Sequence, residues 1–95
     1  MSEVNVVALI VALPEHRAAV DKAVRAMVAP THTEPGCIQY DLHEETEHPG
    51  SFVFIERWKS EQALKEHMAM PYHDAFLAEL NGKLAKLEVK KLVRL

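Results

Sequence analysis

The N-terminal segment, residues 4–13, is apolar at almost every position and has the sequence V-N-V-V-A-L-I-V-A-L. It is rich in β-branched residues and too short for a stable isolated helix, so we predict a strand. An amphipathic strand would alternate apolar and polar residues, whereas this one is apolar on both sides. Both of its faces should therefore be covered in the folded protein.

The next segment, from Pro14 to about Ala29, has the period of an amphipathic helix. Apolar residues recur at helical spacing, at Val20, Ala23, Val24 and Met27. Proline suits the first turn of a helix, because no intrahelical partner is needed for the N–H that it lacks. We expect the helix to stop at Pro30, where a polar stretch begins that ends in Pro35 and Gly36.

Two short segments, residues 37–44 and 51–58, alternate in the manner of strands. Ile38, Tyr40 and Leu42 share one face of the first segment, and Phe52, Phe54, Glu56 and Trp58 share one face of the second. The acidic turn between them ends in Pro49 and Gly50 and is short enough to make the pair a hairpin.

The remaining residues predict a helix in two parts and a last strand. Ser60 is a favourable N-cap, and Pro71 is expected to interrupt the helix and restart it. The first part carries Ala63, Leu64, His67 and Met68, and the second has an apolar stripe of Tyr72, Phe76, Leu80 and Leu84. Gly82 should loosen the end of the helix, and the alternation over residues 86–95 predicts a strand.

The predicted order is β-α-β-β-α-β within one domain, residues 1–95. This order is typical of the α+β class with a ferredoxin-like fold, in which two helices cover one face of a four-stranded antiparallel sheet. The helices leave the second face of the sheet open, although the first strand is apolar on both sides. A chain of 95 residues has no further layer to cover it, so we expect a second copy, in a twofold homodimer.

Charge and composition exclude several classes of protein. Fourteen acidic and eleven basic side chains give a formal net charge of −3, which argues against a nucleic-acid partner. No apolar run approaches the ~18 residues of a membrane span, and the N-terminus does not resemble a secretory signal. The single cysteine, Cys37, cannot form an internal disulfide. A cytoplasmic location is expected.

Six histidines are the most unusual feature of the composition. Most are expected to be surface residues, but His67 shares a stripe with Ala63 and Leu64 and should face inward. His73 lies six residues further on, beside Tyr72. A buried imidazole near a phenol and near Trp58 could act as a base, or it could be a core histidine bound to a backbone carbonyl.

The sequence contains no familiar cofactor or metal motif. The glycines at 36, 50 and 82 are isolated, so no Gly-rich phosphate loop is present. His43 and His48 are five residues apart, at a strand end and in a turn, whereas zinc-binding helices place two histidines four apart. Acidic neighbours argue against a reactive Cys37 thiol. An enzyme with this sequence is expected to need no metal and no organic cofactor, or to use a cofactor as its substrate.

Five stretches occur in the order and the element placement of a known family. They are Glu34-Pro35-Gly36-Cys37-Ile38-Gln39-Tyr40, then Phe52-Val53-Phe54-Ile55-Glu56-Arg57-Trp58-Lys59-Ser60, then Ala63-Leu64-Lys65-Glu66-His67, then Pro71-Tyr72-His73, and finally Phe76. Together they resemble the antibiotic biosynthesis monooxygenase family of small dimeric α+β barrels. The resemblance spans essentially the whole chain.

This resemblance implies a fold, a dimer and a set of possible activities. The family includes cofactor-independent quinol monooxygenases, haem-degrading enzymes and an isomerase of a phosphorylated signal. His67 matches the family's pocket histidine on the helix, and Glu56 and Trp58 match its strand motif. The haem-degrading branch has an Asn on the first strand, where this chain has Val7, and a Trp on the second helix, where this chain has none.

The resulting hypothesis is a cofactor-independent monooxygenase that oxidises a small hydroxylated, quinol-like aromatic with O2. His67 would be the base that removes the phenolic proton. The residues expected to bind the substrate are Trp58, Tyr72, His73, Glu56 and Phe76. One alternative is an isomerase of a small phosphorylated signal, which would need basic side chains such as Arg57 and Arg94 inside the pocket. Another is a binding module without turnover.

Overall fold

A computed structural model describes residues 2–95 of the chain. Its elements, in order along the chain, are β1 (Val4–Ala12), a 3-10 turn η1 (Pro14–His16), α1 (Arg17–Ala26), α2 (Val28–His32), β2 (Cys37–Glu44), β3 (Ser51–Trp58), α3 (Glu61–Met68), α4 (Pro71–Leu80) and β4 (Leu84–Leu92). The α+β class and the predicted order of strands and helices are confirmed.

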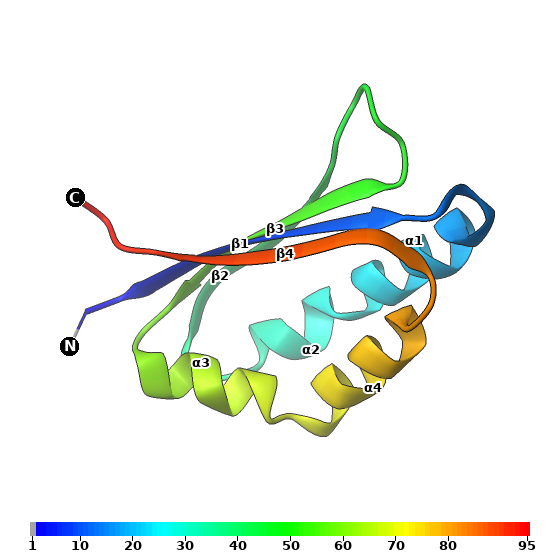
Figure 1. Cartoon of the computed structure of the whole chain (residues 1–95). Helices are drawn as coiled ribbons and strands as arrows, with labels where there is room; N and C mark the ends of the chain where they lie inside the picture. The colour runs from blue at the N-terminus through cyan, green and yellow to red at the C-terminus, as the bar shows by residue number, and fades with distance from the viewer. Residues whose placement is uncertain (1) are drawn as a thin grey trace.

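The four strands form one antiparallel sheet in the order β2-β3-β1-β4, and the helices all lie on one of its faces (Figure 1). The central strands β1 and β3 pair so that Val7 is opposite Ile55 and Ala8 is opposite Phe54. This is the predicted ferredoxin-like arrangement. It leaves β2 and β4 at the two edges of the sheet.

Two element boundaries differ from the sequence-based expectation. Pro30 does not stop the first helical region, because it lies in the first turn of the short helix α2, where no intrahelical bond requires its N–H. The last strand begins at Leu84 and ends at Leu92, so Leu84 belongs to β4 rather than to the helical stripe. Helix α4 ends at Leu80, and Gly82 turns the chain with a positive φ of 77°.

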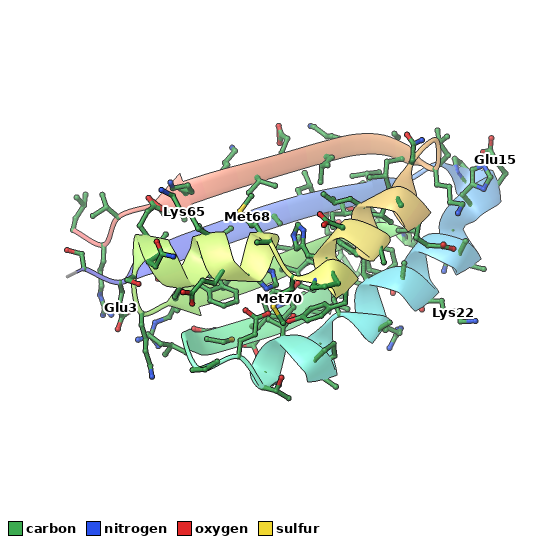
Figure 2. The ribbon with its side chains drawn as sticks, turned by 90° about the horizontal axis from the view of Figure 1, so that it is seen from below. Glu3, Glu15, Lys22, Lys65, Met68 and Met70 are labelled. Carbon is green, nitrogen blue, oxygen red and sulfur yellow. The ribbon has the colours of Figure 1, made fainter. Side chains whose placement is uncertain are left out.

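Pro71 restarts the helix as predicted. Ser60 caps α3 by accepting a hydrogen bond from the Ala63 amide at 3.1 Å, and α3 ends at Met68. Met70, labelled in Figure 2, marks the break, and Pro71 occupies the first turn of α4. The break allows α3 and α4 to take different directions across the sheet (Figure 1).

The core fills the space between the helices and one face of the sheet. Its fully buried side chains include Trp58, Phe52, Phe54, Ile10, Val20 and Val24. On the opposite face Val7, Leu9 and Val11 of β1 are only half-buried, and Ile55 of β3 is 39% exposed. The predicted second apolar face of β1 is therefore present, and nothing in residues 2–95 covers it. No helix in residues 2–95 is long and apolar enough to cross a membrane.

Candidate active site

A cavity of about 300 Å³ lies between α3, α4 and the helix-facing side of the sheet. It exists because the helices do not cover the inner face of the edge strand β4. Leu87 and Val89 pair with Ile10 and Ala8 of β1 and point to this face, yet they are 48% and 61% exposed. With the exposed Met68, which lies on the side of α3 that faces the strands (Figure 2), they form an apolar mouth.

The lining is mostly apolar and contains few polar side chains. Among the described residues these are Tyr40, Glu56, His67, His73 and Lys91. Burial raises the pKa of Tyr40 well above its usual value, so its hydroxyl stays protonated. Lys91 lies at the outer side, where its Nζ is 2.6 Å from Oε1 of Glu61.

His67 is oriented by a carboxylate. Its Nδ1 lies 2.8 Å from Oε2 of Glu34, and the two side chains are only 3% and 8% exposed. A carboxylate oxygen accepts, so Nδ1 carries the hydrogen of this bond, and in the form of the ring that acts as a base the lone pair is on Nε2. Nε2 has no hydrogen-bond partner in residues 2–95, and the side chain lines the cavity. The arrangement suits a base directed at a bound molecule.

Glu34 is itself held from two sides. The hydroxyl of Tyr72 donates to the same Oε2 that binds His67. Burial and this bond to Glu34 raise the pKa of Tyr72 to about 12, so the phenol remains a donor. Gly36, two residues after Glu34, packs against Ala63 of α3 so closely that a Cβ would clash. This contact brings the loop before β2 against the helix that carries His67.

A second buried carboxyl, Glu56 of β3, lies at the cavity. It is 6% exposed, and its Oε1 accepts a hydrogen bond of 2.9 Å from the indole Nε1 of Trp58. Burial raises the pKa of Glu56 to about 7, although the bond from Trp58 opposes the rise. The negative charge of Glu34 adds to the rise. Near neutral pH a large fraction of Glu56 is therefore the neutral acid.

His73 is the second histidine of the cavity. Its ring is roughly perpendicular to that of His67, with centroids 4.9 Å apart and planes at 78°. Its Nδ1 is buried without a hydrogen-bond partner in the described chain. Burial lowers the pKa of His73, and the neighbouring His67 lowers it further, so this imidazole stays neutral near pH 7.

The sequence model of the family described as antibiotic biosynthesis monooxygenase matches residues 4–79, which is most of the chain. The chain belongs to this family. His67, Glu56 and Trp58 lie within the matched region, and so do most of the residues that line the cavity.

Individual members of the family agree with this assignment. A Mycobacterium tuberculosis relative named "Putative monooxygenase Rv0793" is 35% identical over 90% of this chain and 83% of its own length. Its solved structure superposes with a TM-score of 0.93 over 99% of this chain and 96% of that one. The crystal structure of PA3566 from Pseudomonas aeruginosa is 33% identical, with a TM-score of 0.94 over 100% and 96% of the two chains. "Putative monooxygenase YcnE" of Bacillus subtilis is 33% identical over 70% of each chain.

The predicted site residues of this family member fall into two groups. His67, Glu56, His73 and Phe76 line the cavity. Trp58 and Tyr72 were expected to line it as well, but they lie behind its wall. Trp58 is fully buried under His67, and the Tyr72 hydroxyl is engaged by Glu34. Trp58 positions His67 and Glu56, and Tyr72 positions Glu34, which in turn holds His67.

Sequence reasoning missed Glu34 and Tyr40 as parts of the site. In the sequence Glu34 stands out only as the first residue of the first family motif, and no spacing rule connects it with a histidine 33 positions later. Tyr40, whose ring centroid is 5.6 Å from that of His67, looked like an ordinary core residue of an alternating strand. The order of motifs typical of this family was the one available signal for Glu34.

The two arginines proposed for a phosphorylated substrate do not line the cavity. Arg57 and Arg94 border another recess, near the start of β1 and the end of β4, which Glu56 also borders, and Arg57 pairs with Glu3 at 3.0 Å. Lys91 is the one lysine or arginine that lines the cavity in residues 2–95. The described residues also bring no three His, Cys, Asp or Glu side chains together in a metal-binding group.

Proposed function

We propose that this protein is a cofactor-independent monooxygenase that oxidises a small hydroxylated, quinol-like aromatic with O2. One observation carries the proposal. His67 is buried, its Nδ1 is held by Glu34, and its Nε2 is free at an apolar cavity. A base in a water-poor pocket is what the first step, removal of a phenolic proton, requires.

The remaining chemistry can come from the substrate itself. A quinol anion is electron-rich enough to give one electron to O2, and the resulting pair combines to a C–O bond. One oxygen atom stays in the product, and the other leaves as water. The substrate supplies both electrons and both hydrogens of that water, so a 1,4-quinol and O2 yield a hydroxyquinone and water. This balance requires no added reductant, metal or flavin.

The size and lining of the cavity support an aromatic substrate. About 300 Å³ is at the lower end of the usual range for ligand pockets and suits a molecule of one or two rings. Phe54 and Phe76 supply apolar surface for such a molecule, with ring centroids 6.4 Å apart. Glu56, as a neutral acid, does not repel an anionic quinol.

The isomerase alternative has weaker support. It would use the same histidine to move a proton, but a phosphoryl group needs several cations close together. Among the described residues Lys91 is the one lysine or arginine that lines the cavity, and it is paired with Glu61. A binding module differs from both enzymes because it would bind a ligand without converting it.

We further propose that the functional unit is a homodimer formed through the open face of the sheet. Val7, Leu9, Val11 and Ile55 form an apolar strip on β1 and β3 that no other part of the described chain covers. A twofold pairing of this face with itself would bury the strip on both copies.

A cytoplasmic location is part of the proposal as well. Cys37 has no second cysteine to pair with. Burial and the surrounding carboxylates raise the pKa of its thiol, so it has little thiolate and little tendency to react. A cysteine of this kind is compatible with a reducing compartment.

O2 uptake with a panel of benzo- and naphthoquinols, after dialysis against a chelator, tests the proposed activity. We expect uptake above the protein-free rate. We also expect His67→Gln to reduce it by at least ~10²-fold, because the substitution removes the base. His67→Gln should melt close to the wild type, since glutamine can keep the bond to Glu34.

The matched control is His48→Gln, which replaces an exposed histidine in the turn between β2 and β3 and should leave uptake unchanged. A wild type that consumes no O2 with any quinol would contradict the proposal. Full activity in a normally folded His67→Gln would transfer the role of base to His73. Activity that is lost on chelation and restored by a metal would contradict the metal-free mechanism.

A further inference from the structure

Glu56 is a buried carboxyl at the cavity that the removal of the phenolic proton does not use. Its Oε1 is held by Trp58, whereas its Oε2 makes no hydrogen bond in residues 2–95, and the side chain lines the cavity. We infer that Glu56, in its protonated form, is the general acid that gives a proton to the oxygen atom leaving as water. The inference rests on the proposed monooxygenase function.

The two buried carboxyls of the site have opposite surroundings. Glu34 accepts two hydrogen bonds on one oxygen, from His67 and Tyr72. Glu56 accepts one bond, from Trp58, and its burial favours the neutral form. Two carboxyls whose environments differ in this way commonly divide the roles of anion and acid in one active site.

The charged and titratable groups around Glu56 leave it without a strong counter-ion. Tyr40 lies directly opposite it on β2, and Lys91 shares the cavity from β4. His67 of α3 and His73 of α4 line the same cavity, and Glu34 acts on it from the loop before β2. Arg57 and Arg94 border a second recess with Glu56, but Arg57 is paired with Glu3, and neither arginine makes an ion pair with Glu56 in residues 2–95. Tyr40 is a neutral phenol, His73 is neutral, Lys91 is engaged by Glu61, and Glu34 contributes a negative charge. Burial and this negative charge keep the proton on Glu56 up to a pKa of about 7.

The reaction needs an acid at one specific step. After O2 has added to the ring carbon and the peroxide has been protonated, that carbon carries one hydrogen and an OOH group. His67 Nε2 removes this hydrogen as a proton, the C–H electron pair forms the new C=O bond, and the O–O bond breaks. The leaving hydroxide takes the proton of Glu56 and departs as water. Glu56 is then an anion and His67 a cation, and exchange of one proton restores both.

Without an acid the same intermediate has a second outcome. The peroxide group can leave intact as H2O2, so that the quinol becomes a quinone and O2 is reduced without insertion into the ring. The balance is one quinol and one O2 to one quinone and one H2O2. The acid therefore acts on how O2 is partitioned between hydroxyquinone and H2O2, whereas the base acts both on how fast O2 is consumed and on this partition.

The experiment measures O2 uptake and H2O2 release together, with 1,4-dihydroxynaphthalene as the probe and the protein-free rate subtracted. We expect wild type to release little H2O2 at pH 6, and more as the pH rises through about 7 and Glu56 loses its proton. Glu56→Gln keeps an oxygen for the Trp58 bond but has no acidic proton. It should release H2O2 for most of the O2 consumed, at every pH.

Three further variants separate this role from others. His67→Gln should slow uptake and also raise the H2O2 share, because His67 removes the C–H proton in the water-forming step, whereas Glu56→Gln should raise the H2O2 share and leave the rate of uptake close to that of wild type. Glu66→Gln removes an exposed carboxyl of α3 and should behave as wild type. Glu56→Asp keeps an acid and should give an intermediate H2O2 share, which serves as the test if Glu56→Gln does not fold. Fluorescence of Trp58, the only tryptophan, monitors the environment of Glu56 in each variant.

The outcomes distinguish the inference from the function on which it rests. If Glu56→Gln folds and its H2O2 share equals that of wild type at all pH values, the acid role is wrong and the monooxygenase proposal stands. The same holds if Glu56→Asp behaves as wild type and the wild-type share does not change with pH. If wild type consumes no O2 with this quinol or with others, both proposals are wrong.

Discussion

The indole of Trp58 lies against the imidazole of His67, with ring centroids 4.5 Å apart and ring planes inclined by 34°. Trp58 comes from the sheet and His67 from α3, so the stack connects the two layers of the fold. The same indole donates its N–H to Glu56. One fully buried side chain thus positions both the imidazole and the second carboxyl of the cavity.

Glu34→Gln should reduce turnover by about 10²-fold, because the amide no longer stabilises the imidazolium that forms when His67 accepts a proton. Steady-state O2 uptake measures the effect. Tyr72→Phe is the comparison, because it removes one hydrogen bond to Glu34 and keeps the charge. We expect it to lose less than about tenfold in rate and roughly 1 kcal/mol in the free energy of unfolding. Equal rates in Glu34→Gln and wild type would contradict this role of Glu34.

Gly36→Ala should weaken the site without touching any polar group in it. The added methyl group clashes with Ala63, so the loop that carries Glu34 has to move away from α3. We expect a lower melting temperature and a reduced rate, because the bond from His67 to Glu34 is lost or lengthened. Gly82→Ala is the control for the loss of a glycine: it strains a turn with positive φ, but its Cβ meets no neighbour and lies far from Glu34 in sequence. The rate of O2 uptake by Gly82→Ala, measured at a temperature at which this variant is folded, should equal that of wild type.

The stability of the protein should depend on pH through Glu56. Its pKa is about 7 in the folded protein and near 4.5 in the unfolded chain, so the folded state binds the proton more tightly. The resulting stabilisation is complete below pH 4.5 and is lost as the pH rises through 7, by about 3 kcal/mol in all. Denaturant unfolding of wild type and Glu56→Gln at pH 5 and pH 8 measures it.

The difference between these two proteins isolates Glu56, because His73 acts in the opposite direction. The lowered pKa of His73 makes the folded state less stable as the pH falls below its usual value. This contribution is present in both proteins and cancels in the comparison. If the difference in the free energy of unfolding between wild type and Glu56→Gln is the same at both pH values, Glu56 does not hold its proton as described.

Sedimentation at micromolar concentration should give about twice 10.7 kDa. Ile55→Glu places a charge in the centre of the open sheet face, where a second copy would have to bury it, and should shift the protein to the monomer. Lys22→Glu, on the exposed side of α1 (Figure 2), is the control and should remain a dimer. A clean wild-type monomer would exclude pairing through this face.

Local patterns were sufficient for most of the fold. The two-residue period of 37–44 and 51–58, the helical period after Pro14 and the restart at Pro71 each depend on neighbours a few residues apart, so they can be recognised without tertiary information. The predicted end of the first helix at Pro30 and the assignment of Leu84 to a helical stripe were wrong. Both depend on where the chain turns between elements, which local periodicity does not show. The inward position of His67 also followed from its helical stripe, and burial confirms it.

The partners of His67 depended on tertiary structure. Glu34 reaches it across 33 residues because Gly36 lets a loop pack against Ala63, and no periodicity encodes such a contact. The raised pKa of Glu56 likewise results from burial under helices that are distant in sequence. Side-chain periodicity is a property of a single element, so it shows which face a residue lies on. Charge, proton affinity and hydrogen bonding depend on everything packed against that face, and only the assembled fold determines them.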